Sequence, residues 1–228
     1  MRDEHRITNL PLIVVGGGGH AKVLVSTLFL LRQKVLGFVD LNRSMPPLLG
    51  IANLGDDDAV FAHSPDQVRL VNGVGSTSST IQRQRIYEKF VKRGFVFESV
   101  IHPFAIVAPE VEIGAAVQVM AGAVLQPGTS LGDNVIVNTG ACVDHDCLIE
   151  AHAHIAPRAV LSGNVHIGRG SHIGTGATII QGIRVGAAAI VGAGAVVIRA
   201  VPDEVTVAGV PAEIVTHRVT SRPEGTRC

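Results

Sequence analysis

Residues 143–173 read VDHDCLIEAHAHIAPRAVLSGNVHIGRGSHI, and this stretch decides the fold. An aliphatic residue occupies every sixth position, as Val143, Ile149, Ile155, Leu161, Ile167 and Ile173. The same phase continues in both directions, without interruption, over residues 101–197. Four positions after each of these residues the side chain is small or β-branched nearly every time, as at Cys147, Ala153, Ala159 and Val165. Each hexapeptide therefore directs two side chains into an interior.

A six-residue period fits neither the alternation of a flat strand nor the 3.6-residue repeat of a helix. It predicts a parallel β-helix, in which each hexapeptide is one short strand with its turn and three hexapeptides complete a triangular coil. At about 18 residues per coil, residues 101–202 would form roughly five to six coils stacked about 4.8 Å apart. Parallel crossovers are normally right-handed, so the period alone does not indicate a left-handed coil.

Composition narrows the class of protein. The chain has 228 residues, is 46% hydrophobic and carries a formal net charge of zero, which gives no reason to expect nucleic acid or an anionic membrane as a partner. Its cysteines, Cys142, Cys147 and Cys228, lack a CxxC spacing, which favours reduced thiols over a disulfide framework. No apolar run has membrane-spanning length and no signal peptide is recognisable. We therefore predict a soluble, cytoplasmic protein.

The segment 10–100 has a different pattern, in which apolar strands alternate with helices. We predict strands over 10–15, 35–39, 68–71 and 95–100, and helices over 20–31, over 56–62 and from a capping box at Ser79 and Gln82 to near Gly94. The alternation predicts a small parallel, Rossmann-like α/β domain. Residues 101–215 would form the β-helix domain, and the polar segments 1–9 and 216–228 are predicted to be disordered tails.

A glycine-rich turn follows the first predicted strand. Residues 16–21 read GGGGHA, which matches G-x-G-x-x-A between a strand and a helix, and Asp40 ends the second strand. Glycines let backbone amides approach a phosphate, and a helix N-terminus favours its negative charge. The motif therefore predicts binding of a nucleotide or a nucleotide-linked compound. The alternatives are a tight turn without a ligand, a capping role for His20 and a structural role for Asp40.

His145 is a candidate general base within the repeat. It lies outside the inward phase set by Val143 and Cys147, and two carboxylates, Asp144 and Asp146, flank it. A carboxylate can fix the tautomer of an imidazole and stabilise the imidazolium that forms. Gly163 follows one coil later, so it should stack on His145 and leave an open space with a free backbone N–H beside the ring. The alternative is a solvated surface histidine.

The repeat also carries a column of histidines, because His154 and His172 are one coil apart. Together with His145, His152 and His166 they raise the alternative of a zinc site. The spacing of two residues between His152 and His154 is also that of neighbours on one side of a strand, so we predict no metal.

The chain as a whole, over residues 10–215, resembles the sialic acid O-acetyltransferase and nucleotide-linked amino-sugar N-acetyltransferase family. The resemblance is carried by the Gly-rich domain, by Ile101-His102-Pro103, by the unbroken repeat with Asp144-His145-Asp146, and by Gly209-Val210-Pro211-Ala212. It implies a left-handed β-helix, acetyl-CoA as co-substrate and a homotrimer with active sites between adjacent solenoids.

The resemblance also implies roles for single residues. His145 would be the general base, and Asp146 falls where the family has an acidic neighbour, commonly glutamate, with Asp144 as a competitor. The substrate-binding residues would be Gly18, Gly19, His20, Asp40, Gly75, Ser76 and Asn138. The acetyl-CoA-binding residues would be His154, Gly163, Gly192 and Ala193.

These inferences together predict an N-acetyltransferase that acts on the 4-amino group of a sugar linked to UDP, dTDP or GDP. An O-acetyltransferase of sialic acid or another free sugar is the first alternative. A zinc enzyme resembling the γ-class carbonic anhydrases and an NAD-binding scaffold remain as alternatives from other classes.

Overall fold

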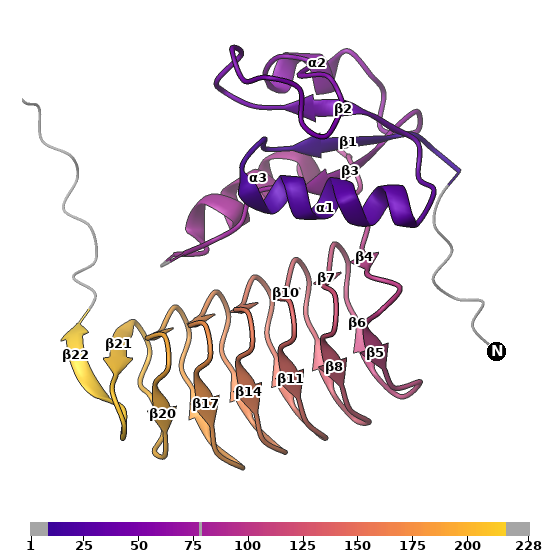
Figure 1. Cartoon of the computed structure of the whole chain (residues 1–228). Helices are drawn as coiled ribbons and strands as arrows, with labels where there is room; N and C mark the ends of the chain where they lie inside the picture. Colours follow the sequence, from indigo (N-terminus) through magenta and orange to yellow (C-terminus); the bar gives the residue numbers. More distant parts are fainter. Residues whose placement is uncertain (1–8, 78, 218–228) are drawn as a thin grey trace, which may run out of the picture.

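The computed structural model describes residues 9–77 and 79–217. These residues form an α/β domain that lies beside a long solenoid, with the coils of the solenoid stacked in one direction (Figure 1). The predicted tail at residues 1–8, the greater part of the predicted tail after residue 215, and Cys228 lie outside the described residues. Among the residues described, no helix has the length and apolar character needed to cross a membrane.

The N-terminal domain contains a three-stranded parallel sheet in the order β2-β1-β3. Its elements are β1 (Leu12–Val15), α1 (Gly19–Leu30), β2 (Val35–Val39), α2 (Asp57–Phe61), β3 (Arg69–Asn72) and α3 (Ile81–Val91). Because side chains alternate along a strand, β1 contributes side chains to two hydrophobic cores, one on each face of the sheet. Leu12 and Val14 pack toward α1 and the solenoid residue Met120, and Ile13 and Val15 pack with Phe90 of α3.

Two predicted features of this domain are wrong. Residues 95–100 form no fourth strand. Phe97 makes one parallel bridge to Leu70 of β3, after which the chain enters the solenoid at Val100. The capping box is absent as well, because α3 begins at Ile81 and its N-cap Thr80 makes no side-chain cap. The Thr80 hydroxyl instead donates to the carbonyl of Gly170 at 2.6 Å, so a contact with the solenoid takes the place of a local cap.

The solenoid is a left-handed parallel β-helix built of two-residue strands. Three sheets run along it, and neighbouring strands in each sheet are one coil apart in sequence. Sheet 1 contains β4 (Val100–Ile101), β7 (Gln118–Val119), β10 (Ile136–Val137), β13 (His154–Ile155), β16 (His172–Ile173) and β19 (Ile190–Val191). Sheet 2 contains β5 (Ile106–Val107), β8 (Val124–Leu125), β11 (Cys142–Val143), β14 (Val160–Leu161), β17 (Thr178–Ile179) and β20 (Val196–Val197). Sheet 3 contains β6 (Glu112–Ile113), β9 (Ser130–Leu131), β12 (Leu148–Ile149), β15 (His166–Ile167) and β18 (Arg184–Val185).

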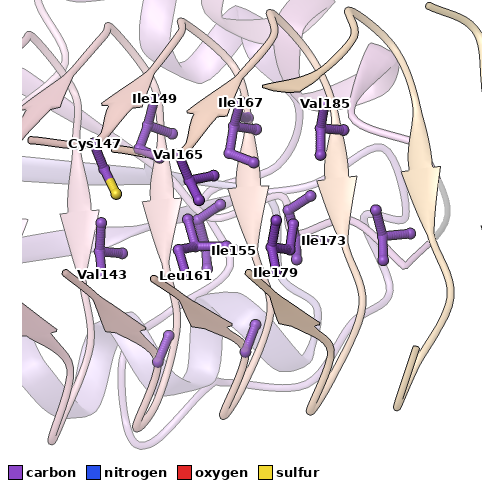
Figure 2. Packing of buried hydrophobic residues seen from close by; sticks show 14 of the residues in the cluster. Val143, Cys147, Ile149, Ile155, Leu161, Val165, Ile167, Ile173, Ile179 and Val185 are labelled. Atoms are coloured by element: carbon purple, nitrogen blue, oxygen red, sulfur yellow. The ribbon is translucent and has the colours of Figure 1, made fainter. Parts of the chain in front are cut away.

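The second residue of every two-residue strand is the aliphatic residue of the hexapeptide phase, and it points inward. From Val119 to Val197 these side chains are at most 2% exposed. Figure 2 shows the resulting columns, in which Val143, Leu161 and Ile179 continue one another from coil to coil. The side chain of Cys147 fills the interior beside Ile149 and Val165, as the phase predicts (Figure 2). A continuous narrow core of aliphatic side chains therefore holds the coils together.

The chain closes the solenoid with β21 (Val205–Ala208) and β22 (Glu213–His217). Strand β21 pairs in parallel with β19, and β22 pairs with β21 in antiparallel orientation. Thr216 and His217 therefore belong to a strand, although the predicted tail begins at residue 216. The hairpin supplies an antiparallel strand at the last coil, which covers the backbone edge that a parallel stack would leave unpaired.

Candidate active site

His145 and Asp146 lie together at the corner where β11 of sheet 2 leads to β12 of sheet 3. We call the line of corners between these two sheets the His145 edge. The Nδ1 atom of His145 and the Oδ2 atom of Asp146 are 2.8 Å apart. Asp144 takes a different role, because its Oδ1 atom accepts from the backbone N–H of His145 at 2.8 Å. Asp146, rather than Asp144, therefore contacts the ring.

The contact with Asp146 orients the imidazole and favours one tautomer. When Nδ1 carries the proton that it donates to Asp146, the neutral ring presents the lone pair of Nε2. The hydrogen bond to Asp146 raises the pKa of His145, and the charges of Asp144 and Asp146 add to this effect. The ring is 51% exposed, so Nε2 can reach a ligand at this edge.

Gly163 stacks on His145 at the same edge, in the next coil. A Cβ atom built on Gly163 would lie 2.5 Å from Cε1 of His145 and 3.0 Å from Cδ2, so any side chain here would displace the ring. The turn uses the N–H groups of Ser162 and Asn164 for backbone hydrogen bonds and leaves that of Gly163 free. The predicted pairing of a free N–H with an open ring edge is thus present.

A pocket of about 760 Å³ lies between the glycine-rich turn and the solenoid. Its lining includes eight of the residues predicted to bind ligands: Gly18, Gly19, His20, Asp40, Gly75, Ser76, Asn138 and His154. The first six belong to the N-terminal domain, and Asn138 and His154 belong to the solenoid. Docking of the two domains therefore forms this pocket, and neither domain contains it alone.

Asp40 holds the glycine turn in place. Its Oδ2 atom accepts from the N–H of Gly17 at 2.8 Å, and its Oδ1 atom accepts from the N–H of Asn42 at 2.9 Å. Gly17 cannot be larger, because a Cβ atom there would lie 2.6 Å from the ring of Phe38. Gly18 and Gly19 have no atom within 4 Å of such a position, so they face open space in the pocket. The turn thus offers unshielded backbone at the N-terminus of α1.

His20 is held as a neutral donor. The Nε2 atom of His20 donates to Oε1 of Gln118 at 2.7 Å, and Gln118 is oriented by a bond from its Nε2 atom to the carbonyl of Asn72 at 2.8 Å. Burial, together with the nearby charge of Arg83, lowers the pKa of His20 to about 4. The His20 imidazole therefore adds no charge to the pocket near neutral pH.

His154 connects the two domains inside the pocket. Asn138 is oriented by the N–H of Thr139, which donates to its Oδ1 atom at 2.8 Å, so its Nδ2 atom donates to Nε2 of His154 at 3.0 Å. The Nδ1 atom of His154 consequently carries the proton and donates to Oγ of Ser76 at 2.6 Å. Burial and the neighbouring His172 hold the pKa of His154 well below its usual value.

The predicted site residues fall into two groups in one chain. Asn138, Gly192 and Ala193 lie at the corners where sheet 1 leads to sheet 2, which we call the pocket edge, but of these three only Asn138 lines the pocket. His145 and Gly163 lie at the His145 edge, on the other side of sheet 2, and are not part of the pocket lining. One chain therefore presents the base and the pocket on opposite borders of the same sheet.

A buried polar network beneath the pocket was not predicted from the sequence. Arg83 of α3 is 1% exposed and donates through Nη1 to the carbonyls of Asn72 and Val74, at 2.9 and 2.8 Å. Asn72 in turn donates to Oδ1 of Asn134 in the solenoid at 3.2 Å. Burial lowers the pKa of Arg83 to about 9. An amphipathic helix normally places arginine in solvent, so only the docked solenoid shows that this one is interior.

The histidine column is present, and its member His154 lines the pocket. His154 and His172 pair across β13 and β16, with ring centroids 5.0 Å apart, and both contact the hydroxyl of Ser76. Within residues 9–77 and 79–217, no three metal-ligating side chains converge on one point. Cys147 is not placed as a nucleophile, since burial raises the pKa of its thiol and the thiol donates to the carbonyl of Ser162.

Both domains of the chain are similar to known proteins. The family model described as the PglD N-terminal domain matches residues 11–90, and the bacterial transferase hexapeptide (six repeats) matches residues 146–181. The acetyltransferase domain of PglB from Neisseria gonorrhoeae, solved with acetyl coenzyme A, is 41% identical, with 91% of this chain and 100% of that chain covered and a TM-score of 0.86.

Two further solved structures are similar over nearly their whole length. PerB from Caulobacter crescentus, in complex with CoA and GDP-perosamine, is 39% identical, with 90% and 97% of the two chains covered and a TM-score of 0.85. WeeI from Acinetobacter baumannii is 28% identical, with 90% and 100% covered and a TM-score of 0.76.

The left-handed solenoid and the match of its repeat to the bacterial transferase hexapeptide model identify a hexapeptide-repeat acyltransferase. With its Gly-rich N-terminal domain and its identity to PglB and PerB, the chain belongs to the hexapeptide-repeat acetyltransferases that carry a PglD-type N-terminal domain.

Proposed function

We propose that this enzyme transfers the acetyl group of acetyl-CoA to the 4-amino group of a nucleotide-linked amino-deoxy sugar. The observation that carries the proposal is the geometry at the His145 edge, where an oriented imidazole faces a glycine with a free N–H. The pocket beneath the glycine-rich turn supports a nucleotide-linked acceptor. The similarity to PglB with acetyl coenzyme A and to PerB with CoA and GDP-perosamine supports the donor and the class of acceptor.

The proposed reaction is a direct transfer. The neutral amine attacks the thioester carbonyl, and a C–N bond forms while Nε2 of His145 takes the proton from the nitrogen. The N–H of Gly163 donates to the oxyanion of the tetrahedral intermediate. Collapse of the intermediate breaks the C–S bond, and the imidazolium returns the proton to the departing thiolate. Asp146 holds the ring and stabilises its charged form throughout.

The pocket would hold the acceptor by its nucleotide end. The backbone at Gly18 and Gly19 and the N-terminus of α1 suit the diphosphate, because both present N–H groups and a favourable dipole to an anion. Asp40, His20, Gly75 and Ser76 line the same space. Asn138 and His154 lie at the solenoid wall, where the sugar and the acetyl-CoA arm would approach.

We also propose a homotrimer in which each active site is shared by two chains. His145 and the pocket lie on opposite borders of sheet 2, so we expect each site to combine the pocket of one chain with His145 of another. Cyclic association would place the His145 edge of one subunit beside the pocket edge of the next. The outward residues of sheet 2 suit such contacts, because five of the six are apolar: Ile106, Val124, Cys142, Val160 and Val196.

The decisive experiment measures thiol release from acetyl-CoA with a panel of UDP-, dTDP- and GDP-linked 4-amino sugars and with free sialic acid. We expect turnover with one nucleotide-linked amino sugar and a loss of about 10²-fold or more in His145→Ala. His63→Ala serves as a control, since this residue lies in the N-terminal domain outside the pocket. Activity with sialic acid alone would show that the acceptor is a free sugar. Full activity of His145→Ala would show that His145 is not the general base.

A further inference from the structure

Gly128 lies at the His145 edge one coil before Asp146, between β8 and β9. A Cβ atom built on Gly128 would collide with Oδ1 of Asp146 and would lie 3.4 Å from its Cγ atom. The Asp146 carboxylate thus lies directly over the α-carbon of Gly128, in the space that any other residue would fill. The other oxygen of the same carboxylate contacts Nδ1 of His145.

Two glycines therefore enclose the His145–Asp146 pair from the two neighbouring coils. Gly163 leaves room for the imidazole on one side, and Gly128 leaves room for the carboxylate on the other. Asp146 itself has a left-handed backbone conformation, with φ of 58°, and this conformation sets the direction of its Cα–Cβ bond. With one oxygen over Gly128 and the other at Nδ1, the carboxylate has little freedom to move without losing the contact with His145.

We propose that Gly128 is a positioning residue for His145, and that it acts by keeping the space in which the Asp146 carboxylate reaches Nδ1. This inference rests on the proposed role of His145 as general base. A methyl group at position 128 would move the carboxylate and break the 2.8 Å contact, after which the ring could rotate and change tautomer. A displacement of a catalytic group by about 1 Å can lower the reaction rate by the order of 10²-fold.

The substitution needs a control for backbone strain, because Gly128 has φ of 76° and an alanine is disfavoured there. Gly94 provides it. It has φ of 83°, it is exposed like Gly128, and it follows α3 in the N-terminal domain, outside the pocket lining. A Cβ atom on Gly94 would meet only Pro65, at an ordinary contact of 3.6 Å. Gly94→Ala therefore carries similar backbone strain without touching Asp146 or the pocket.

The test is a double-mutant cycle with Gly128→Ala, Asp146→Ala and the pair combined, and Gly94→Ala beside them. We expect Gly128→Ala and Asp146→Ala each to lower kcat by about tenfold or more, and the double variant to match Asp146→Ala alone. Gly94→Ala should keep the wild-type kcat, with a melting temperature lowered about as much as in Gly128→Ala. Additive losses in the cycle, or wild-type kcat in Gly128→Ala together with an unchanged His145 pKa, would overturn the inference.

A second readout separates this inference from the proposed function. The charged groups that face His145 are Asp144 and Asp146, so an NMR titration of the His145 ring reports the Asp146 contact in the absence of substrate. We expect the His145 pKa to fall in Gly128→Ala, as in Asp146→Ala, and to stay unchanged in Gly94→Ala. An unchanged His145 pKa in Gly128→Ala refutes the positioning role. A lowered pKa with undiminished turnover would retain that role and refute His145 as the base.

Discussion

Ser76 of the N-terminal domain and His154 of the solenoid share a hydrogen bond of 2.6 Å between Oγ and Nδ1. The two residues are 78 positions apart in the sequence, and no local pattern relates them. Their contact closes the pocket between the two domains and fixes the tautomer of His154, whose Nε2 atom accepts from Asn138. The tautomer of His154 in the solenoid therefore depends on Ser76, which lies in a loop of the N-terminal domain.

The first prediction concerns this contact. Ser76→Ala removes the acceptor for the His154 N–H, and a lost neutral hydrogen bond corresponds to about 1 kcal/mol. We expect the KM for the acceptor or for acetyl-CoA to rise by about five- to tenfold, because the His154 ring becomes free to change tautomer. Steady-state kinetics with each substrate varied in turn measure this. Ser130→Ala on sheet 3 is the control, and equal KM values in the two variants would contradict the prediction.

The second prediction is the pH dependence of the reaction. Only neutral His145 can accept a proton, and the hydrogen bond to Asp146 raises its pKa above the usual value. The value of kcat/KM should therefore fall, as pH decreases, through a pKa above about 6.5. Asp146→Asn should move this acid limb to lower pH, and Asp144→Asn should move it less. An acid limb that stays in place in Asp146→Asn would show that another group titrates.

The third prediction tests the nucleotide pocket. Gly18 has an ordinary φ of −76° and open space around its Cβ position, so Gly18→Glu should fold and project a carboxylate into the pocket. We expect nucleotide affinity to fall by about tenfold or more, since like charges repel in a partly enclosed site. Isothermal titration with the nucleoside diphosphate of the best substrate gives the value. Gly18→Ala should bind nearly as the wild type, and tight binding by Gly18→Glu would place the nucleotide elsewhere.

The fourth prediction follows from the proposed shared sites. At acceptor concentrations well below the raised Kd of Gly18→Glu, His145→Ala and Gly18→Glu should each retain about a tenth of the wild-type activity or less. Subunits of the two variants should restore activity when they are mixed and reassembled. In a cyclic trimer with random mixing, about one interface in four pairs an intact His145 edge with an intact pocket. We therefore expect about a quarter of the wild-type activity. Absence of recovery in verified mixed trimers would mean that each chain uses its own His145.

The fifth prediction concerns the buried Arg83. Arg83→Met removes its hydrogen bonds to the carbonyls of Asn72, Val74 and Asn134. Asn72 keeps the bond from Gln118, and the carbonyls of Val74 and Asn134 lose their donor. We expect a loss of roughly 2–4 kcal/mol in the free energy of unfolding, measured by chemical denaturation. Arg85→Met, two residues further along α3 and exposed, should change stability by less than about 0.5 kcal/mol. Equal stability of the two variants would show that the network contributes little.

The repeat made much of the site predictable. Because three hexapeptides close a coil, residues 18 apart must stack, and this placed Gly163 on His145 and His154 beside His172. The same phase also places His145 and Asn138 at different corners of the coil. This separation follows from the sequence, but it becomes evident only when the three sheets are assigned. The choice between Asp144 and Asp146 was not predictable, because it depends on side-chain direction at the turn.

The sequence by itself determined the β-helix, the inward phase, the α/β domain before it and the stacked pair of His145 and Gly163, because each follows from a local pattern or a fixed period. Only the tertiary structure decided the end of that domain at residues 95–100, the contact of Thr80 with Gly170, the burial of Arg83 and the union of Ser76 with His154. The physical reason is that contacts between two docked domains follow no repeating pattern in the sequence. The polar groups at this interface are paired across it, so neither segment alone shows which partners they take.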